Sequence, residues 1–251
     1  MRVIWKKCEF SGEMFLGLGS DHVLAHGWMD ADEGLRAGSI LTTGSCSVRL
    51  LARLTLSLDQ DLFGSGWLCA PLQGRPDPGH YAAALSRDGF SVAWITLSDK
   101  GSRGERVDAS GPAIRDTVAA QLPVSLARGV IIPDEPELLK TALVQFCLLH
   151  GFDLVFTTGG TGVGPRDITP EATIPLLDKR LPGFERAMTE VSLAKTPHGM
   201  ISRAVAGIMG RSVVVNLPGS PKAVRENLSA ILPALRHTVE KLQGDPRDCG
   251  Q

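Results

Sequence analysis

The sequence predicts an α/β protein: a mostly parallel sheet with helices on both faces, preceded by a small β-leaning unit. From about residue 90, short apolar runs alternate with helical patterns, which is typical of βαβ units. The first 89 residues instead contain short apolar runs separated by Gly, Asp and Ser. We therefore divide the chain into residues 1–89, residues 90–244 and a tail of residues 245–251.

Composition limits the classes of function. The chain has 251 residues, with 26 basic and 27 acidic side chains and a pI near 6.6, so no strong overall field would attract nucleic acid or an anionic membrane. The N-terminus lacks the pattern of a secretory signal, and no run approaches the roughly 20 apolar residues that span a bilayer. We expect a soluble cytoplasmic protein with no nucleic-acid or membrane partner.

The N-terminal unit has strand-like runs at residues 39–43 and 47–58 and a turn-rich stretch at 74–79. The five cysteines of the chain form no CxxC pair, which favours reduced thiols over a zinc site. His22 and His26, downstream of Cys8, would need a second ligand pair to bind a metal, so structural roles are favoured. The sequence predicts no function for this unit.

Four strands are predicted in the larger unit, at residues 92–97, 126–132, 154–157 and 212–217. The first is apolar except for Thr96, as expected for a strand buried on both faces. Helices are predicted to begin near Pro112, Glu137 and Pro221, because proline suits a first helical turn and Ser220 can cap the last of them. Ligands of open α/β sheets bind beyond the carboxyl ends of the strands.

A glycine-rich loop follows the third of these strands, where residues 157–173 read TTGGTGVGPRDITPEAT. Gly159, Gly160, Gly162 and Gly164 allow the backbone to approach an anion closely, and amides at the start of the following helix point toward it. This predicts a phosphate-binding loop. A tight turn without a ligand is the alternative, because short glycine patterns recur by chance.

Two carboxylates stand near this predicted anion. Arg166 offers a planar donor fork for phosphate, whereas Asp167 would repel it unless a divalent cation lay between them. Asp134 ends the neighbouring strand and is expected to face the same crevice. Together the aspartates suit one metal ion bound also by phosphate oxygens; helix capping is the alternative for each.

Two further loops complete the predicted crevice. The segment SDKGSRGERVDASGP, residues 98–112, lies between a buried strand and a helix that proline begins. The segment NLPGSPK, residues 216–222, provides a second helix N-terminus. Such loops are often merely solvated, but their position after strands favours a role in the site.

With these loops in view, residues 90–244 resemble the MogA/MoaB family of molybdenum cofactor biosynthesis proteins. The resemblance rests on six segments in family order: SDKGSRGERVDASG, IIPDE, TTGGTGVGPRDITPEAT, LPGFERAM, ISRAV and NLPGSPKAV. It implies a three-layer α/β/α domain of the molybdopterin-binding fold, which is usually a homotrimer. It also implies adenylylation of molybdopterin by ATP with Mg²⁺, giving adenylyl-molybdopterin and pyrophosphate.

The resemblance assigns roles to individual residues. Asp134 and Asp167 match the aspartates that such enzymes use, here as catalytic residues and Mg²⁺ ligands. The remaining assignments fall in three groups: a nucleotide side at Ser98, Asp99, Asp108, Ser110 and Gly111; a phosphate loop at Thr158, Gly159, Gly160, Thr161 and Gly162; and a pterin side at Asn216, Pro218, Gly219 and Pro221. Arg166, Arg203 and Lys222 are supplementary cations or ordinary surface charges.

Two alternatives use the same fold. The first is a molybdopterin-binding or delivery protein without catalysis, against which the presence of both aspartates argues. The second is a nucleotide pyrophosphate hydrolase of the CinA kind, which has a different continuation after this domain. The resemblance further implies that a molybdenum insertase receives the product.

Overall fold

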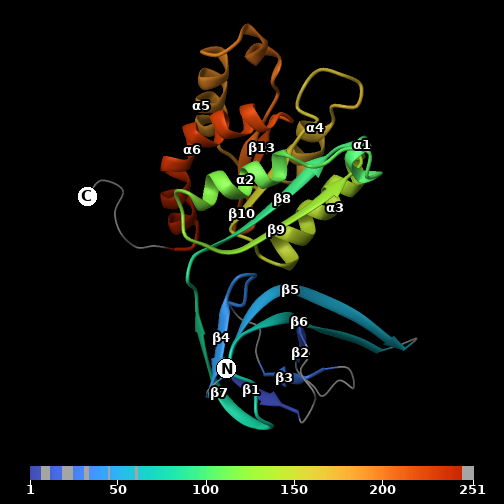
Figure 1. The fold of residues 1–251 in the computed structure, drawn as a ribbon, viewed down its shortest axis with the longest axis vertical. Helices are drawn as coiled ribbons and strands as arrows, with labels where there is room; N and C mark the ends of the chain where they lie inside the picture. The colour runs from blue at the N-terminus through green and yellow to red at the C-terminus, as the bar shows by residue number, and fades with distance from the viewer. Residues whose placement is uncertain (7–11, 19–24, 31–33, 45, 60–61, 245–251) are drawn as a thin grey trace. The chain divides into compact units, whose positions relative to one another are not determined.

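The structure is a computed structural model that describes residues 1–6, 12–18, 25–30, 34–44, 46–59 and 62–244. The chain forms two compact units, Met1–Gly89 and Phe90–Gln251 (Figure 1). Each unit has its own sheet, so each is described by itself. Cys8, His22 and Cys249 lie outside the described residues.

The first unit is a closed barrel with strand order β1-β3-β2-β6-β5-β4-β7. Closure comes from β1, which pairs antiparallel with both β3 and β7. The predicted runs at 39–43 and 47–58 correspond to β4 and β5. The strands are β1 Arg2–Trp5, β2 Met14–Leu18, β3 Gly27–Met29, β4 Ile40–Thr43, β5 Cys46–Asp59, β6 Leu62–Gln73 and β7 Gly79–Ser86.

Some polar side chains of the barrel make hydrogen bonds between its segments. The indole Nε1 of Trp5 donates to Thr43 Oγ1 at 2.9 Å, and His26 Nδ1 accepts from the Phe15 amide at 3.1 Å, a structural role. Cys46 and Cys69 are buried free thiols. Burial raises the pKa of both thiols, which keeps them protonated.

The second unit contains a six-stranded sheet with order β11-β12-β13-β10-β8-β9. Strands β13, β10, β8 and β9 are parallel, whereas β11 and β12 add antiparallel pairs at one edge. The α/β class is confirmed, but strands β11 and β12 were not predicted. The bounds are β8 Phe90–Leu97, β9 Val124–Ile132, β10 Leu154–Thr158, β11 Lys179–Arg180, β12 Ala206–Met209 and β13 Ser212–Leu217.

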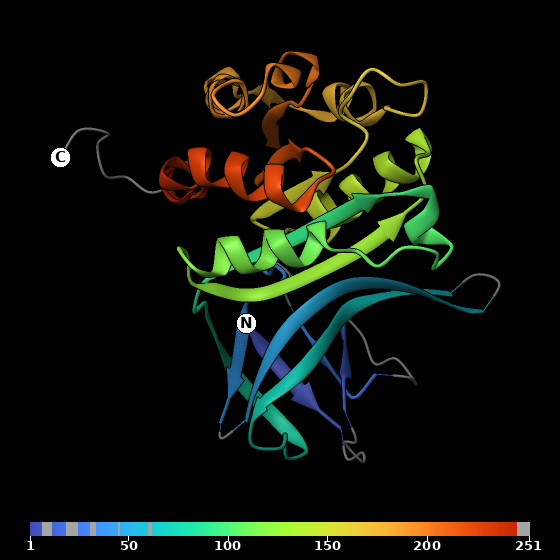
Figure 2. The ribbon, with the colours of Figure 1, turned by 45° about the horizontal axis from the view of Figure 1, so that its top comes forward.

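Helices cover both faces of this sheet (Figure 2). The longest, α6, begins as predicted, with Pro221 in its first turn and the Ser220 hydroxyl accepting from the Ala223 amide at 3.2 Å. No helix in the described residues combines the length and apolar content needed to cross a bilayer. The helices are α1 Asp99–Ser102, α2 Ser110–Ala119, α3 Pro136–Val144 with a π-helical turn Gln145–Leu149, α4 Thr169–Thr173, α5 Pro182–Leu193 and α6 Pro221–Leu242.

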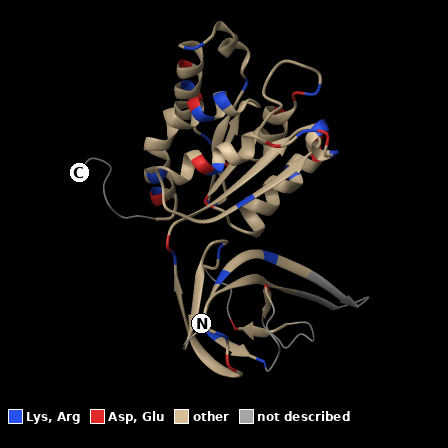
Figure 3. Ribbon diagram, viewed as in Figure 1, with Lys and Arg blue, Asp and Glu red and all other residues tan. Residues whose placement is uncertain are grey.

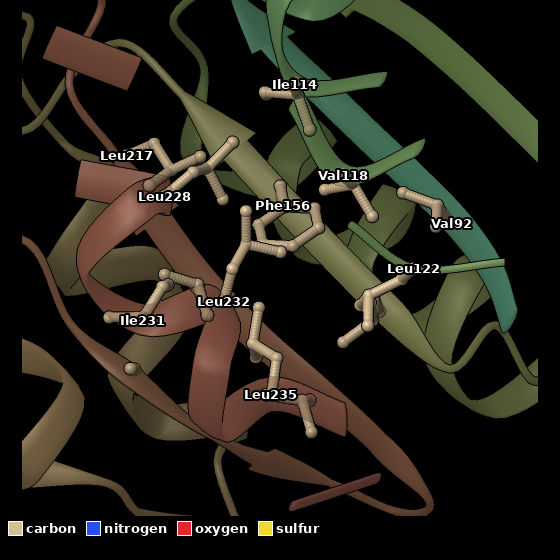
Figure 4. Close-up of a cluster of buried hydrophobic side chains, with 14 of the residues drawn as sticks. Val92, Ile114, Val118, Leu122, Phe156, Leu217, Leu228, Ile231, Leu232 and Leu235 are labelled. Carbon is tan, nitrogen blue, oxygen red and sulfur yellow. The ribbon is translucent and has the colours of Figure 1, made fainter. Parts of the chain in front are cut away.

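Successive side chains of a strand point to opposite faces of the sheet, so neighbouring residues pack against different helices. Phe156 and Leu217 enter a core formed with α2 and α6, which Figure 4 shows. The neighbouring Asn216 points to the other face, where it donates to Thr173 of α4. The core side chains in Figure 4 are Val92, Ile114, Val118, Leu122, Phe156, Leu217, Leu228, Ile231, Leu232 and Leu235.

Candidate functional site

A pocket of about 460 Å³ lies at the carboxyl ends of β8, β9 and β10, where the loops that follow these strands meet the first turns of α2 and α6. This is the expected position for a ligand of an open α/β sheet. The pocket is lined by Thr96, Leu97, Ser98, Gly101, Arg106, Val107, Asp108, Ala109, Ser110, Ile131, Asp134, Thr158, Gly159, Gly219, Ser220 and Pro221.

The walls of this pocket are fixed by hydrogen bonds between its loops. Asp108 accepts from Thr96 Oγ1 at 2.8 Å and from the amides of Ser110 and Gly111, so it caps α2 and its charge is compensated. The Ser110 hydroxyl donates to the Gly219 carbonyl at 2.8 Å, which ties the first turn of α2 to the loop before α6. The two helix N-termini are therefore held at one pocket, where their dipoles favour an anion.

The glycine loop has a backbone that other residues would strain. Gly159 and Gly160 have φ of 98° and 64°, and a Cβ at Gly160 would lie 2.5 Å from Thr169 Oγ1. Thr169 in turn fastens the loop to α4, because its hydroxyl donates to the Gly159 carbonyl at 2.8 Å. Thr158 Oγ1 donates to the Pro218 carbonyl at 2.6 Å. Glycine here serves a tight turn and also allows close approach of a ligand.

Asp134 is the carboxylate that this pocket exposes to a ligand. It is held against Asp99 by reciprocal bonds: the Asp99 amide donates to Asp134 Oδ2 at 3.0 Å, and the Asp134 amide donates to Asp99 Oδ1 at 3.1 Å. Burial raises the pKa of Asp134, and the negative charges of Asp99 and Asp167 raise it further. A cation in this position would relieve that repulsion.

Arg166 compensates part of this negative charge. Its Nη2 donates to Asp99 Oδ1 at 2.8 Å and its Nη1 to Glu135 Oε1 at 3.0 Å. These bonds lower the pKa of Asp99 and raise that of Arg166. Arg166 therefore connects the loops after β8, β9 and β10 instead of pointing a free donor fork at phosphate.

Arg203, like Arg166, binds protein groups; its contacts are with the glycine loop. Its guanidinium donates to the Gly162 carbonyl at 2.6 Å and the Asp167 carbonyl at 2.7 Å, and it also contacts the Glu171 carboxylate. These contacts hold the backbone on both sides of the turn. Of the three cations proposed from the sequence, two thus bind protein groups, and Lys222 lines neither this pocket nor the second one described below.

Asp167 lies beside the glycine loop. Its Oδ2 accepts from the Gly164 amide at 2.7 Å, and its amide donates to the Gly164 carbonyl. Within the described ranges, no group of three or more His, Cys, Asp or Glu side chains is arranged to hold a metal ion. A metal at Asp134 and Asp167 would therefore need oxygen atoms of a substrate to complete its coordination, which is the pattern that Mg²⁺ favours.

A second pocket, of about 220 Å³, lies on the other side of the glycine loop. Lys195 and His198 give it two basic side chains that the sequence analysis missed, because they lie in the turn and the short 3-10 helix Pro197–Ile201 that follow α5 and do not follow a strand of the sheet. The lining residues are Thr161, Gly162, Ser192, Lys195, Thr196, His198, Gly199, Ile201, Ser202, Pro218, Ala223 and Glu226.

The predicted site residues divide between the two pockets. The larger one contains Ser98, Asp108, Ser110, Asp134, Thr158, Gly159, Gly219 and Pro221, and the smaller one contains Thr161, Gly162 and Pro218. Asp99, Gly111, Gly160 and Asp167 support these walls without lining them.

The expectation that Asn216 lines a ligand pocket is wrong. Its side chain is fully buried, and its Nδ2 donates to Thr157 Oγ1 at 2.9 Å and Thr173 Oγ1 at 3.2 Å. The physical reason is strand alternation: position 216 of β13 faces α4, so the amide fastens that helix to the sheet.

Basic and acidic side chains are interspersed along the ribbon of the second unit (Figure 3). This mixture agrees with the near-zero net charge of the sequence. Binding of an anionic ligand would have to depend on local groups at the two pockets.

Comparisons with known proteins place these features in a family. A family model described as a probable molybdopterin binding domain matches residues 93–237. Gephyrin of Dictyostelium discoideum is 41% identical over 165 residues, 62% of this chain and 23% of gephyrin, so the chain spans about a quarter of that relative. Molybdopterin adenylyltransferase of Helicobacter pylori is 41% identical over 155 residues, 61% of this chain and 88% of that enzyme.

A solved structure shows the same likeness. The molybdopterin biosynthesis enzyme MoaB of Thermus thermophilus superposes with a TM-score of 0.58 at 47% sequence identity, over 63% of this chain and 99% of that one. The match therefore takes in nearly all of that protein but leaves over a third of this chain outside.

Proposed function

This chain belongs to the molybdopterin-binding domain family, and from that membership we propose that it is a molybdopterin adenylyltransferase of molybdenum cofactor biosynthesis. The substrates are molybdopterin and ATP, and the products are adenylyl-molybdopterin and pyrophosphate. The three-layer α/β/α molybdopterin-binding fold is the scaffold of this proposal. The relatives named for the same activity support it.

The observation that carries the proposal is the pair of pockets on either side of one glycine loop. Thr158 and Gly159 line the larger pocket, and Thr161 and Gly162 line the smaller. We assign ATP to the larger pocket, where two helix N-termini converge, and the pterin to the smaller one. Of the residues that the resemblance puts on the pterin side, Pro218 lines the smaller pocket, whereas Gly219 and Pro221 line the larger one. This arrangement would bring the terminal phosphate of the pterin and the α-phosphate of ATP together at the loop.

Asp134 and Asp167 are the residues that would hold Mg²⁺. The donor set fits the ion: both ligands are carboxylates, and Asp134 is crowded by negative charge that a cation would neutralise. When bound, Mg²⁺ would lower the repulsion between the two phosphate groups. The choice of Mg²⁺ follows from the family resemblance and not from a set of protein ligands that would hold the ion alone.

The chain's own residues would act mainly by positioning. The terminal phosphate of molybdopterin is already anionic at neutral pH, so no strong general base is required. The first turns of α2 and α6 and the amides of the glycine loop orient the phosphates, and Ser110 and Thr158 hold those elements in register. As the nucleophilic oxygen bonds to the α-phosphorus, the bond to pyrophosphate breaks.

The test is pyrophosphate release by the full chain with molybdopterin, ATP and Mg²⁺. We expect release to require all three, and Asp167→Asn to abolish most of it while molybdopterin binding persists. Asp178→Asn, a carboxylate that accepts from Gly210 outside both pockets, is the control and should leave the rate unchanged. No release above a pterin-free control would leave only the binding or delivery function.

The homotrimer and the transfer of product to a molybdenum insertase, both implied by the family resemblance, stay predictions. A mass measurement in solution tests the first, and capture of adenylyl-molybdopterin by a purified insertase tests the second.

A further inference from the structure

Arg106 lies in the loop between α1 and α2 and is exposed. Among the residues that line the larger pocket, it is the one Lys, Arg or His. Within the described part of the chain its guanidinium makes no ion pair or side-chain hydrogen bond. Its neighbour Arg103 differs, because it donates to both carboxylate oxygens of Glu105 and does not line the pocket.

The larger pocket contains acidic side chains that would repel a polyphosphate, so binding of a polyphosphate requires positive charge nearby. The other charged side chains in the lining are Asp108 and Asp134, both acidic. Arg166 and Arg203, the cations suggested by the sequence, are bound to Asp99, Glu135 and loop carbonyls. A nucleoside triphosphate adds several negative charges to this setting. The helix N-termini offset part of that charge, and a metal at Asp134 would offset another part.

We propose that Arg106 binds the β- and γ-phosphates of the nucleotide, the pyrophosphate that departs in the reaction. Arg106 and its neighbour Val107, which is 89% exposed, stand at the solvent side of the pocket, whereas Asp134 and Gly159 are less exposed. The polyphosphate therefore extends toward the opening, and the adenylyl group stays near the glycine loop. This inference rests on the proposed function for the identity of the nucleotide.

The chemistry suits a guanidinium. When the pterin phosphate oxygen bonds to the α-phosphorus, the electron pair of the breaking bond goes to the oxygen that links the α- and β-phosphates. Negative charge thus accumulates on the leaving pyrophosphate. The planar donor fork of arginine can bind two of its oxygens at once, which a lysine ammonium cannot reproduce.

Equilibrium binding of inorganic pyrophosphate and of AMP to the full chain, with Mg²⁺ present, tests this assignment. We expect Arg106→Ala to weaken pyrophosphate binding by about 10- to 100-fold, the loss of a charge-assisted hydrogen bond, and to change AMP binding little. Arg103→Ala removes the same charge three residues away and should leave both affinities unchanged. Arg106→Lys should restore only part of the pyrophosphate affinity.

The inference would be overturned by wild-type affinity for pyrophosphate in Arg106→Ala, by equal losses in the two alanine variants, or by a parallel loss of AMP binding. Equal losses would indicate a general field effect, and a parallel loss would indicate a structural defect. Absence of pyrophosphate binding in the wild-type chain would overturn it as well. This binding experiment needs no molybdopterin. Its result therefore stands even if the assay for adenylyl transfer fails.

Discussion

Asp134 sits in an environment that opposes its own ionisation. Burial raises its pKa, and the neighbouring charges of Asp99 and Asp167 add to the rise. Folding therefore favours the protonated carboxyl. Asp134 begins to lower the stability of the folded chain when the pH rises through the ordinary pKa of aspartate, and it does so fully above its raised pKa. A carboxylate that lowers the stability of the fold in this way is expected at a functional site, where stability and activity are often opposed.

Asp134→Asn should therefore raise the free energy of unfolding at neutral pH when no divalent cation is present. The asparagine keeps an oxygen that can accept from the Asp99 amide, but it carries no charge. The gain should shrink as the pH falls and disappear below the ordinary range of aspartate, where Asp134 is protonated too. Urea unfolding in EDTA across this range checks the prediction, and a variant less stable at neutral pH contradicts it.

Arg166 is expected to act as a positioning residue for Asp134. Its pairs with Asp99 and Glu135 are exposed, so their loss should change stability by less than about 1 kcal/mol. Displacing the loops, however, would misalign the reacting phosphates, for which we expect a fall in kcat of about 10- to 100-fold. Arg166→Lys should rescue little, because lysine lacks the fork.

The control for Arg166→Ala is Arg180→Ala, which breaks a similarly paired arginine at Glu185 away from both pockets. Steady-state kinetics of pyrophosphate release and urea unfolding should be measured on the same preparations. Equal effects of both substitutions on kcat would show that Arg166 has no particular role.

For individual residues, the place of a residue directly after a predicted strand was the signal that best predicted whether it lies at the pocket. Asp134 and Gly159 could be predicted to share a pocket because each follows a parallel strand. Asn216 was misplaced because it belongs to the strand itself, where alternation turns its side chain toward α4. Arg106 could not be singled out, because the pairing that engages Arg103 and leaves Arg106 in the pocket depends on the folded loop.

The glycine loop is the segment in which the backbone conformation most strongly requires a particular residue type, glycine. Gly160→Ala places a side chain at φ 64° and 2.5 Å from Thr169 Oγ1, so we expect a loss of about 1–3 kcal/mol in the free energy of unfolding. Gly183→Ala, in the first turn of α5 with open space around it, should be neutral or slightly stabilising. Urea unfolding of the two variants compares them directly, and equal stabilities would contradict this account of the loop.

Central elements could be predicted better than edge elements. The predicted bounds of β13 agree with the structure because all six residues are buried between two helical layers and four of them are apolar. Strand β11 lacks that signal, because its two residues, Lys179 and Arg180, are basic and exposed and pair with β12 through the backbone. Strand β12 is buried, but it has only four residues, one of which is Gly207. The barrel likewise depends on the pairing of β1 with β7, which are distant in the sequence.

At the scale of the molecule, the second unit contains a complete core of its own, formed by residues between Phe90 and Leu242. The Thermus protein, almost entirely matched by this part, folds without the barrel. We therefore expect a fragment of residues 90–251 to unfold cooperatively and to release pyrophosphate at a rate within about threefold of the full chain. An unfolded or inactive fragment would show that the barrel is needed for the fold or the reaction.

We propose that the two pockets together support transfer of an adenylyl group from ATP to molybdopterin. The direct measurement uses ATP labelled at the α-phosphate, with molybdopterin and Mg²⁺, and separates the products of the full chain. We expect label in adenylyl-molybdopterin in amounts equal to the pyrophosphate released, and almost none with Asp167→Asn. Label recovered only as free AMP, or only as unreacted ATP, would contradict it.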